Sequence, residues 1–137
     1  MSDVPRKFVW STSLIALLTL SIGCGGAPEK KYIPATDVAR GALEASLKMW
    51  KSGEKHGPVK GFPVPIDVYD ARWPAGKKLQ SYEILREEKT DGAKTFIVKM
   101  KVDGDKEETE LKYLVVGKNP LMVFQEKDYK KASGVGG

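Results

Sequence analysis

Few side chains in this sequence have a type and spacing that suggest catalysis or metal binding. His56 is the only histidine, and it lies in a polar run. A histidine metal site needs further ligands, so His56 alone predicts a solvated loop residue. Asp67 and Asp70 flank Tyr69, where they could bind a cation or act as an acid–base pair. The same pattern is typical of a solvated strand edge, so we expect no catalytic residues, metal or cofactor.

Three aromatic residues are candidates for a small-ligand cavity. Trp50 ends an apolar helical pattern, whereas Tyr82 and Tyr113 belong to strand-like segments. Tyrosine hydroxyls and a tryptophan ring could bind a ligand if they line a hollow between helix and sheet. Core packing explains the same three residues, and we favour it for Trp50.

The single cysteine, Cys24, ends an apolar segment near the N-terminus. Residues 8–22 are uncharged and follow the basic pair Arg6 and Lys7. This run is shorter than the roughly 20 residues of a membrane-spanning helix. Residues 1–23 therefore form a predicted secretory signal peptide.

Residues 20–24, Leu-Ser-Ile-Gly-Cys, resemble the lipobox of bacterial lipoproteins. In that family the cysteine thiol receives a diacylglyceryl group, the leader is cut before it, and the new amine is acylated, often with palmitate. Gly23 fits the family pattern, whereas Ser21 departs from its usual leucine. The resemblance implies a lipid anchor on Cys24 that holds the protein to a membrane of the cell envelope, outside the cytoplasm. Gly25 in place of the family's retention aspartate favours the outer membrane, if the cell has one. The alternatives are a plain signal peptide or a buried cysteine.

One amphipathic helix is predicted after a flexible tether over residues 24–35. Apolar and small residues recur at helical spacing over residues 39–50. Thr36 or Asp37 can cap its start and Gly53 can end it. The residues of its apolar face are Ala39, Ala42, Leu43, Ser46, Leu47 and Trp50.

Residues 81–126 predict a four-stranded antiparallel meander. A two-residue turn at Gly104-Asp105 would place Val98 opposite Leu111 and Phe96 opposite Tyr113. A three-residue loop with Gly92 in the left-handed region would connect the first two strands. A four-residue loop at residues 117–120 would connect the last two. The face expected to pack on the helix consists of Tyr82, Ile84, Phe96, Val98, Met100, Leu111, Tyr113, Val115, Met122 and Phe124.

The opposite face of this sheet also carries apolar residues, which need a cover or a partner. They are Leu85, Ile97, Leu114, Val116, Leu121 and Val123. One interpretation is that residues 58–74 fold over this face through Phe62, Val64, Ile66 and Trp73. The other is a surface for homodimerisation or for an envelope protein partner. Within the same stretch, residues 64–69 can form a short edge strand because prolines are tolerated there.

A helix followed by a meander resembles the cystatin-like and NTF2-like α+β class, in which a curved sheet wraps a helix. The resemblance covers residues 39–50 and 81–126. It departs from the fuller NTF2-like pattern, which has further helices around a deep pocket. It implies one α+β domain over residues 36–127, and we expect residues 128–137 to form a disordered tail.

The 137 residues are 41% hydrophobic and 30% charged, as in an ordinary globular domain. The net charge of +5 is modest and the charges are interspersed, so nucleic-acid binding is not expected. The sequence therefore predicts a lipid-anchored, non-catalytic structural or interaction module of the cell envelope. The alternative is a small-ligand-binding domain that uses a hollow between helix and sheet, and an enzyme ranks third.

The lipid anchor gives a first testable prediction. Replacing Cys24→Ser removes the thiol that accepts the diacylglyceryl group, so the protein should leave the membrane fraction. Mass spectrometry of the native protein should find Cys24 as an acylated N-terminal residue. Detection of an unmodified Cys24 in the mature protein would contradict the prediction.

Overall fold

The predicted amphipathic helix is present in the computed structural model, which describes residues 30–134. After a short 3-10 turn, η3 (Lys30–Tyr32), the helix α1 spans Thr36–Lys51. Its buried residues are the six of the predicted apolar face: Ala39, Ala42, Leu43, Ser46, Leu47 and Trp50. The predicted cap is wrong, because Ala35 is the N-cap and Thr36 instead donates a hydrogen bond to Glu87. The amide of Ser52 donates to the carbonyl of Lys48, and Gly53 ends the helix with a φ of 90°.

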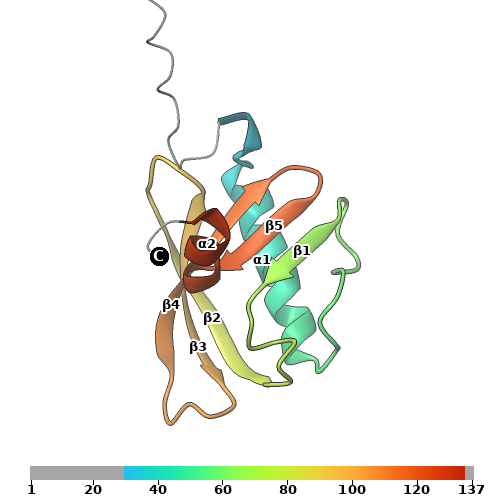
Figure 1. Cartoon of the computed structure of the whole chain (residues 1–137), viewed down its shortest axis with the longest axis vertical. Helices are drawn as coiled ribbons and strands as arrows, with labels where there is room; N and C mark the ends of the chain where they lie inside the picture. Colours follow the sequence, from blue (N-terminus) through green and yellow to red (C-terminus); the bar gives the residue numbers. More distant parts are fainter. Residues whose placement is uncertain (1–29, 135–137) are drawn as a thin grey trace, which may run out of the picture.

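The α+β class is confirmed, but the sheet is five-stranded and mixed (Figure 1). Its strands are β1 (Ile66–Tyr69), β2 (Leu79–Glu88), β3 (Lys94–Val102), β4 (Thr109–Gly117) and β5 (Leu121–Gln125). Their order is β1-β5-β4-β3-β2, with β1 parallel to β5 and the other pairs antiparallel. The four antiparallel strands β2 to β5 form the expected meander, and β1 adds a fifth strand at the sheet edge next to β5.

The central registers follow the cross-strand pairs expected from alternation. Val98 lies opposite Leu111 and Ile84, and Phe96 lies opposite Tyr113. The turns differ from expectation. Residues 103–108 connect β3 to β4, with a tight turn in which the amide of Asp105 donates to the carbonyl of Val102 at 2.9 Å. In the β2–β3 pair the register shifts between Ile84 and Arg86, which we did not expect. Gly92, for which we expected a left-handed conformation, does not adopt a positive φ.

We expected the loop at residues 117–120 to place Tyr113 opposite Phe124 and Val115 opposite Met122, but the observed register of β5 differs by one residue. Gly117 stays in β4 and pairs with Leu121, so that Val115 faces Val123 and Leu114 faces Phe124. Gly117 has a φ of 86°, and a Cβ there would lie 2.5 Å from the carbonyl oxygen of Pro120. Only glycine fits this tight connection. Because side chains alternate along a strand, the shift moves every β5 side chain to the opposite face.

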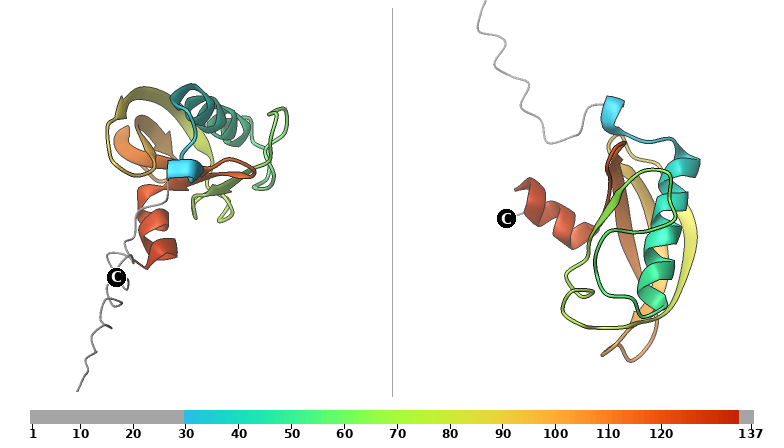
Figure 2. Two further views of the ribbon diagram at one scale, coloured as in Figure 1. Left: turned by 90° about the horizontal axis from the view of Figure 1, so that it is seen from above. Right: turned by 90° about the vertical axis from the view of Figure 1, so that its right-hand side faces the viewer.

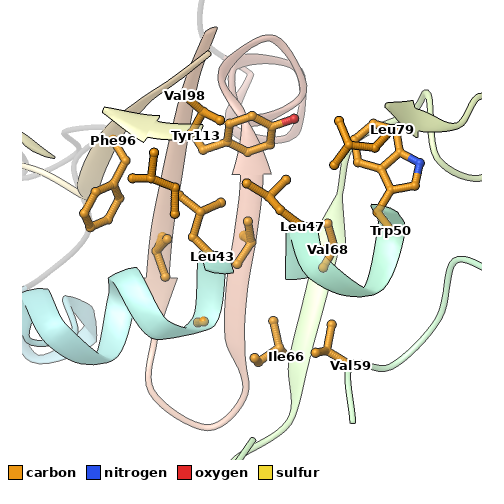
Figure 3. Packing of buried hydrophobic residues seen from close by; sticks show 14 of the residues in the cluster. Leu43, Leu47, Trp50, Val59, Ile66, Val68, Leu79, Phe96, Val98 and Tyr113 are labelled. Carbon is orange, nitrogen blue, oxygen red and sulfur yellow. The ribbon is translucent and has the colours of Figure 1, made fainter. Parts of the chain in front are cut away.

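The main core lies between α1 and one face of the sheet (Figure 3). Leu43, Leu47 and Trp50 of α1 pack there with Phe96, Val98 and Tyr113. The β5 residues that join this core are Leu121 and Val123, in place of the predicted Met122 and Phe124. Residues 58–74, which we considered as a cover for the face opposite α1, pack instead on the α1 side of the sheet. They do so through Phe62, Val64, Ile66 and Trp73.

The second face of the sheet is partly covered by a helix that was not predicted. Helix α2 (Glu126–Ser133) lies on the side opposite α1 (Figure 2). Tyr129 packs with Leu114, Val116, Met122 and Phe124. The expected disordered tail is therefore helical up to Ser133, where the helix ends before Gly134 in the left-handed conformation.

The predicted signal peptide, tether cysteine and lipid anchor lie outside residues 30–134. Within that part of the chain, neither helix is long and apolar enough to span a bilayer.

The core packing of α1 gives a stability prediction. Leu43 is fully buried, so Leu43→Ala should lower the free energy of unfolding by about 2–5 kcal/mol. Val38 on the same helix is 41% exposed, and Val38→Ala should change it by less than about 0.5 kcal/mol. Urea unfolding of the two variants measures the difference. Equal effects would contradict the assignment of the buried face.

Candidate functional site

A buried polar cluster forms where β1 ends. The Asp70 side chain is 2% exposed and faces Arg72, whose Nε donates to Oδ1 at 2.9 Å and whose Nη2 donates to Oδ2 at 2.7 Å. The Tyr113 hydroxyl, on β4, donates to Asp70 Oδ2 at 2.5 Å. It also accepts a hydrogen bond from Arg72 Nη2 at 3.0 Å. A carboxylate buried in this way is stable only because both neighbours donate to it.

The electrostatics of this cluster keep each group in one protonation state near neutral pH. Burial alone would raise the pKa of Asp70, but the hydrogen bonds from Arg72 and Tyr113 and the Arg72 charge lower it below its ordinary value. Burial opposes the charge of Arg72, yet Asp70 raises its pKa overall. Burial, followed by the charge of Asp70, raises the pKa of Tyr113 well above its ordinary value. The three groups therefore join the turn after β1 to β4 through charge-assisted hydrogen bonds.

The cluster supports a pair of stacked tryptophans. The Arg72 guanidinium carbon lies 5.6 Å from the ring centroid of Trp50, a cation–π contact. Trp50 stacks on Trp73 with 5.7 Å between ring centroids. The Nε1 of Trp50 donates to the carbonyl of Lys77 at 2.8 Å, and that of Trp73 donates to the carbonyl of Glu54 at 2.9 Å. The rings thereby tie the end of α1 to the loop before β2.

These rings form one wall of a cavity of about 460 Å³, which we call the tryptophan pocket. Its lining residues are Trp50, Gly53, Glu54, Lys55, His56, Trp73, Pro74, Gly76, Lys77 and Lys78. The volume lies within the range of small-molecule sites.

His56 is an exposed loop residue, as expected, but its ring also makes two defined contacts. Its Nε2 lies 2.7 Å from the carbonyl oxygen of Val68 and must carry the proton, because that oxygen can only accept. The ring also meets Trp73 edge-on at 5.1 Å. The amide of Val59 donates to the carbonyl of Ile66 at 3.5 Å. Together these groups cover the outer edge of β1, which faces away from β5.

A second cavity of about 410 Å³ lies on the other side of His56 and Pro74, and we call it the tyrosine groove. Tyr69 is 43% exposed and stacks on Phe124 with 4.6 Å between ring centroids. Tyr129 of α2 meets Phe124 edge-on at 5.2 Å. Asp128 Oδ2 accepts a hydrogen bond from the amide of Ala71 at 3.2 Å, which links α2 to the turn after β1.

The three residues proposed for a single cavity are separated by the structure. Trp50 lines the tryptophan pocket, whereas Tyr113 is fully buried in the core and contacts Arg72, which lies over the Trp50 ring. The Tyr82 hydroxyl donates to Glu44 at the surface of α1. Partial burial, followed by that carboxylate, raises the pKa of Tyr82 to about 12.

The proposed interaction face is also divided. Ile97 and Val116 are buried and Leu85 and Leu114 are half-buried, whereas Leu121 and Val123 lie in the main core for the register reason given above. We did not predict from the sequence that Arg72 pairs with Asp70, because no motif sets Arg72 apart from a solvated loop residue. We considered Asp70 only as part of a pair with Asp67, which is exposed.

Neither a metal group nor a known relative identifies the site. Among residues 30–134, no three acidic, histidine or cysteine side chains are grouped so as to hold a metal ion. No family model, curated protein or solved structure matches the chain. The function is therefore inferred from sequence and geometry.

The Asp70 cluster predicts an acid-sensitive stability. Folding lowers the pKa of Asp70, so its ionised form stabilises the fold above the ordinary aspartate pKa of about 3.9, and this contribution is lost as the pH falls below that value. Asp70→Asn should cost about 3–5 kcal/mol at neutral pH, because it leaves Arg72 unpaired. It should also reduce the loss of stability between about pH 5 and pH 2.

Urea unfolding across this pH range measures both effects. The matched control is Asp67→Asn, which removes an exposed carboxylate on the same strand. Equal pH profiles for the two variants would show that Asp70 does not carry the effect.

Proposed function

We propose that the chain is a lipid-anchored protein of the cell envelope whose α+β domain is a non-catalytic interaction module. The lipobox-like residues 20–24 support the anchor. Two or more acyl chains would hold the protein stably on a bilayer, where one chain gives only marginal binding. Under this proposal the domain is a cystatin-like or NTF2-like variant, extended by β1 and α2.

The tyrosine groove is the proposed contact surface, and the exposed Tyr69 ring is the observation that carries this proposal. Tyr69 presents one face to solvent while the other rests on Phe124, so it is an aromatic side chain already held in place. Rigid aromatic residues beside an apolar hollow are typical of the centre of protein interfaces. The charged Asp128 and Lys131 also line the groove and would form a polar rim.

The groove continues the apolar second face that the sequence indicated as a contact surface. Phe124 belongs both to the groove and to the small cluster with Leu114, Val116 and Met122 under α2. A partner that inserts an apolar or aromatic side chain beside Tyr69 would therefore pack next to the apolar cluster that α2 covers. We assign this partner to the envelope proteins, in keeping with the proposed anchor.

A small-ligand-binding domain is the second candidate. The space between α1 and the sheet, where we expected a hollow, is packed with side chains (Figure 3). The tryptophan pocket at the end of α1 offers a cavity of suitable size instead.

Site-specific photo-crosslinking tests the contact surface. A photoreactive phenylalanine at position 69 of the full chain, expressed in its native host, should give a discrete adduct with an envelope protein. The same residue at position 38, which is 41% exposed on α1, is the matched control. Tyr69→Ala should weaken capture of the crosslinked protein without loss of folding, because Tyr69 is a surface residue. Equal adducts at both positions, or none at 69, would refute this contact surface.

A further inference from the structure

We propose that the tryptophan pocket binds a small organic anion with a flat apolar body and a carboxylate or phosphate group. The inference deepens the second candidate function and does not depend on docking at Tyr69. It rests on two properties of this pocket: a floor closed by two tryptophan rings whose N–H groups are already bonded, and a rim with an excess of ammonium groups.

The floor of the pocket is apolar. Trp50 and Trp73 close it with the small part of each ring that is not buried, 3% and 4% of the residue, and each indole N–H is already bonded to a backbone carbonyl. Because an indole has no other polar atom, neither ring can hydrogen-bond a ligand. Pro74 adds a further apolar wall, and the edge of His56 is fixed by its bond to Val68. A ligand would therefore place an apolar surface here.

The rim is positively charged. Lys55, Lys77 and Lys78 line the pocket and are exposed, against one lining carboxylate, Glu54. Asp103 lies near the same end of the domain, where its Oδ2 accepts a hydrogen bond from the Lys78 amide at 3.0 Å. It offsets part of the lysine charge, yet cations still outnumber carboxylates. An anionic group is the ligand chemistry that such a rim favours.

The end of α1 does not cancel this preference. Carbonyls at a helix C-terminus carry partial negative charge, which disfavours a nearby anion. Here the amides of Ser52, Gly53 and Glu54 donate to the carbonyls of Lys48, Trp50 and Met49. Lys48 and Lys51 lie in the last turn and offset the remaining dipole.

The chain carries its own reporter for this site. Its tryptophans are Trp10, Trp50 and Trp73, so the full chain with Trp10→Phe emits only from the pocket wall. This chain, in detergent, is titrated with benzoate, phenyl phosphate and the neutral benzyl alcohol while tryptophan emission is followed. We expect a saturable change with at least one anion, and at least about tenfold weaker binding of benzyl alcohol. Tighter binding of benzoate or of phenyl phosphate identifies the preferred anionic group.

Charge variants separate the rim from nonspecific attraction. Lys77→Gln with Lys78→Gln should weaken binding of the better anion about three- to tenfold, as expected for two exposed charge contacts. Lys89→Gln with Lys118→Gln removes two exposed lysines elsewhere and should leave binding unchanged. Raising the salt concentration should weaken binding, because exposed charges are screened.

Three results would overturn the proposal: no emission change with either anion, equal affinity for benzyl alcohol, or equal effects of the two lysine pairs. Circular dichroism of each variant checks that it is folded. A negative result here with a positive crosslink at position 69 would remove the anion site and leave the partner surface intact.

Discussion

The burial of Asp70 beneath Arg72 and Tyr113 is the constraint that organises the end of the domain where the two cavities lie. A carboxylate in an apolar core is unstable unless charge and hydrogen bonds compensate its lost hydration. The guanidinium of Arg72 binds both carboxylate oxygens, and the Tyr113 hydroxyl supplies a further donor. This arrangement fixes the turn after β1 relative to the centre of β4.

From this fixed turn the chain positions two aromatic groups on opposite sides. Arg72 lies over Trp50 and sets the stack with Trp73, which closes one side of the tryptophan pocket. Tyr69, immediately before Asp70 in the chain, points to the other face of the sheet and stacks on Phe124. Alternation along β1 thus sends one residue into the buried cluster and its neighbour into the exposed groove. The two surfaces share His56 and Pro74 as a partition.

The second face of the sheet shows how one local feature alters a surface. The close approach of Pro120 to Gly117 moves the pairing of β5 by one residue relative to the four-residue loop that we expected. Leu121 and Val123 then enter the main core, whereas Met122 and Phe124 face α2. Hydrophobic alternation in β5 did not resolve this choice, because apolar residues occupy both of its faces.

The sequence by itself determined α1, the alternation of β3 and β4 and the α+β class, because helical and strand periodicities are local properties of the chain. The lipobox-like motif at residues 20–24, which predicts the anchor, is likewise a local feature of the sequence. Only the tertiary structure decided that β1 joins β5 in parallel, that α2 covers part of the second face, and that Asp70, Arg72 and Tyr113 meet. The first depends on pairing with a strand distant in sequence, and the second depends on how α2 packs against β4 and β5. In the third, Tyr113 meets Asp70 and Arg72 from more than 40 positions away in the sequence, and no local pattern records such a contact.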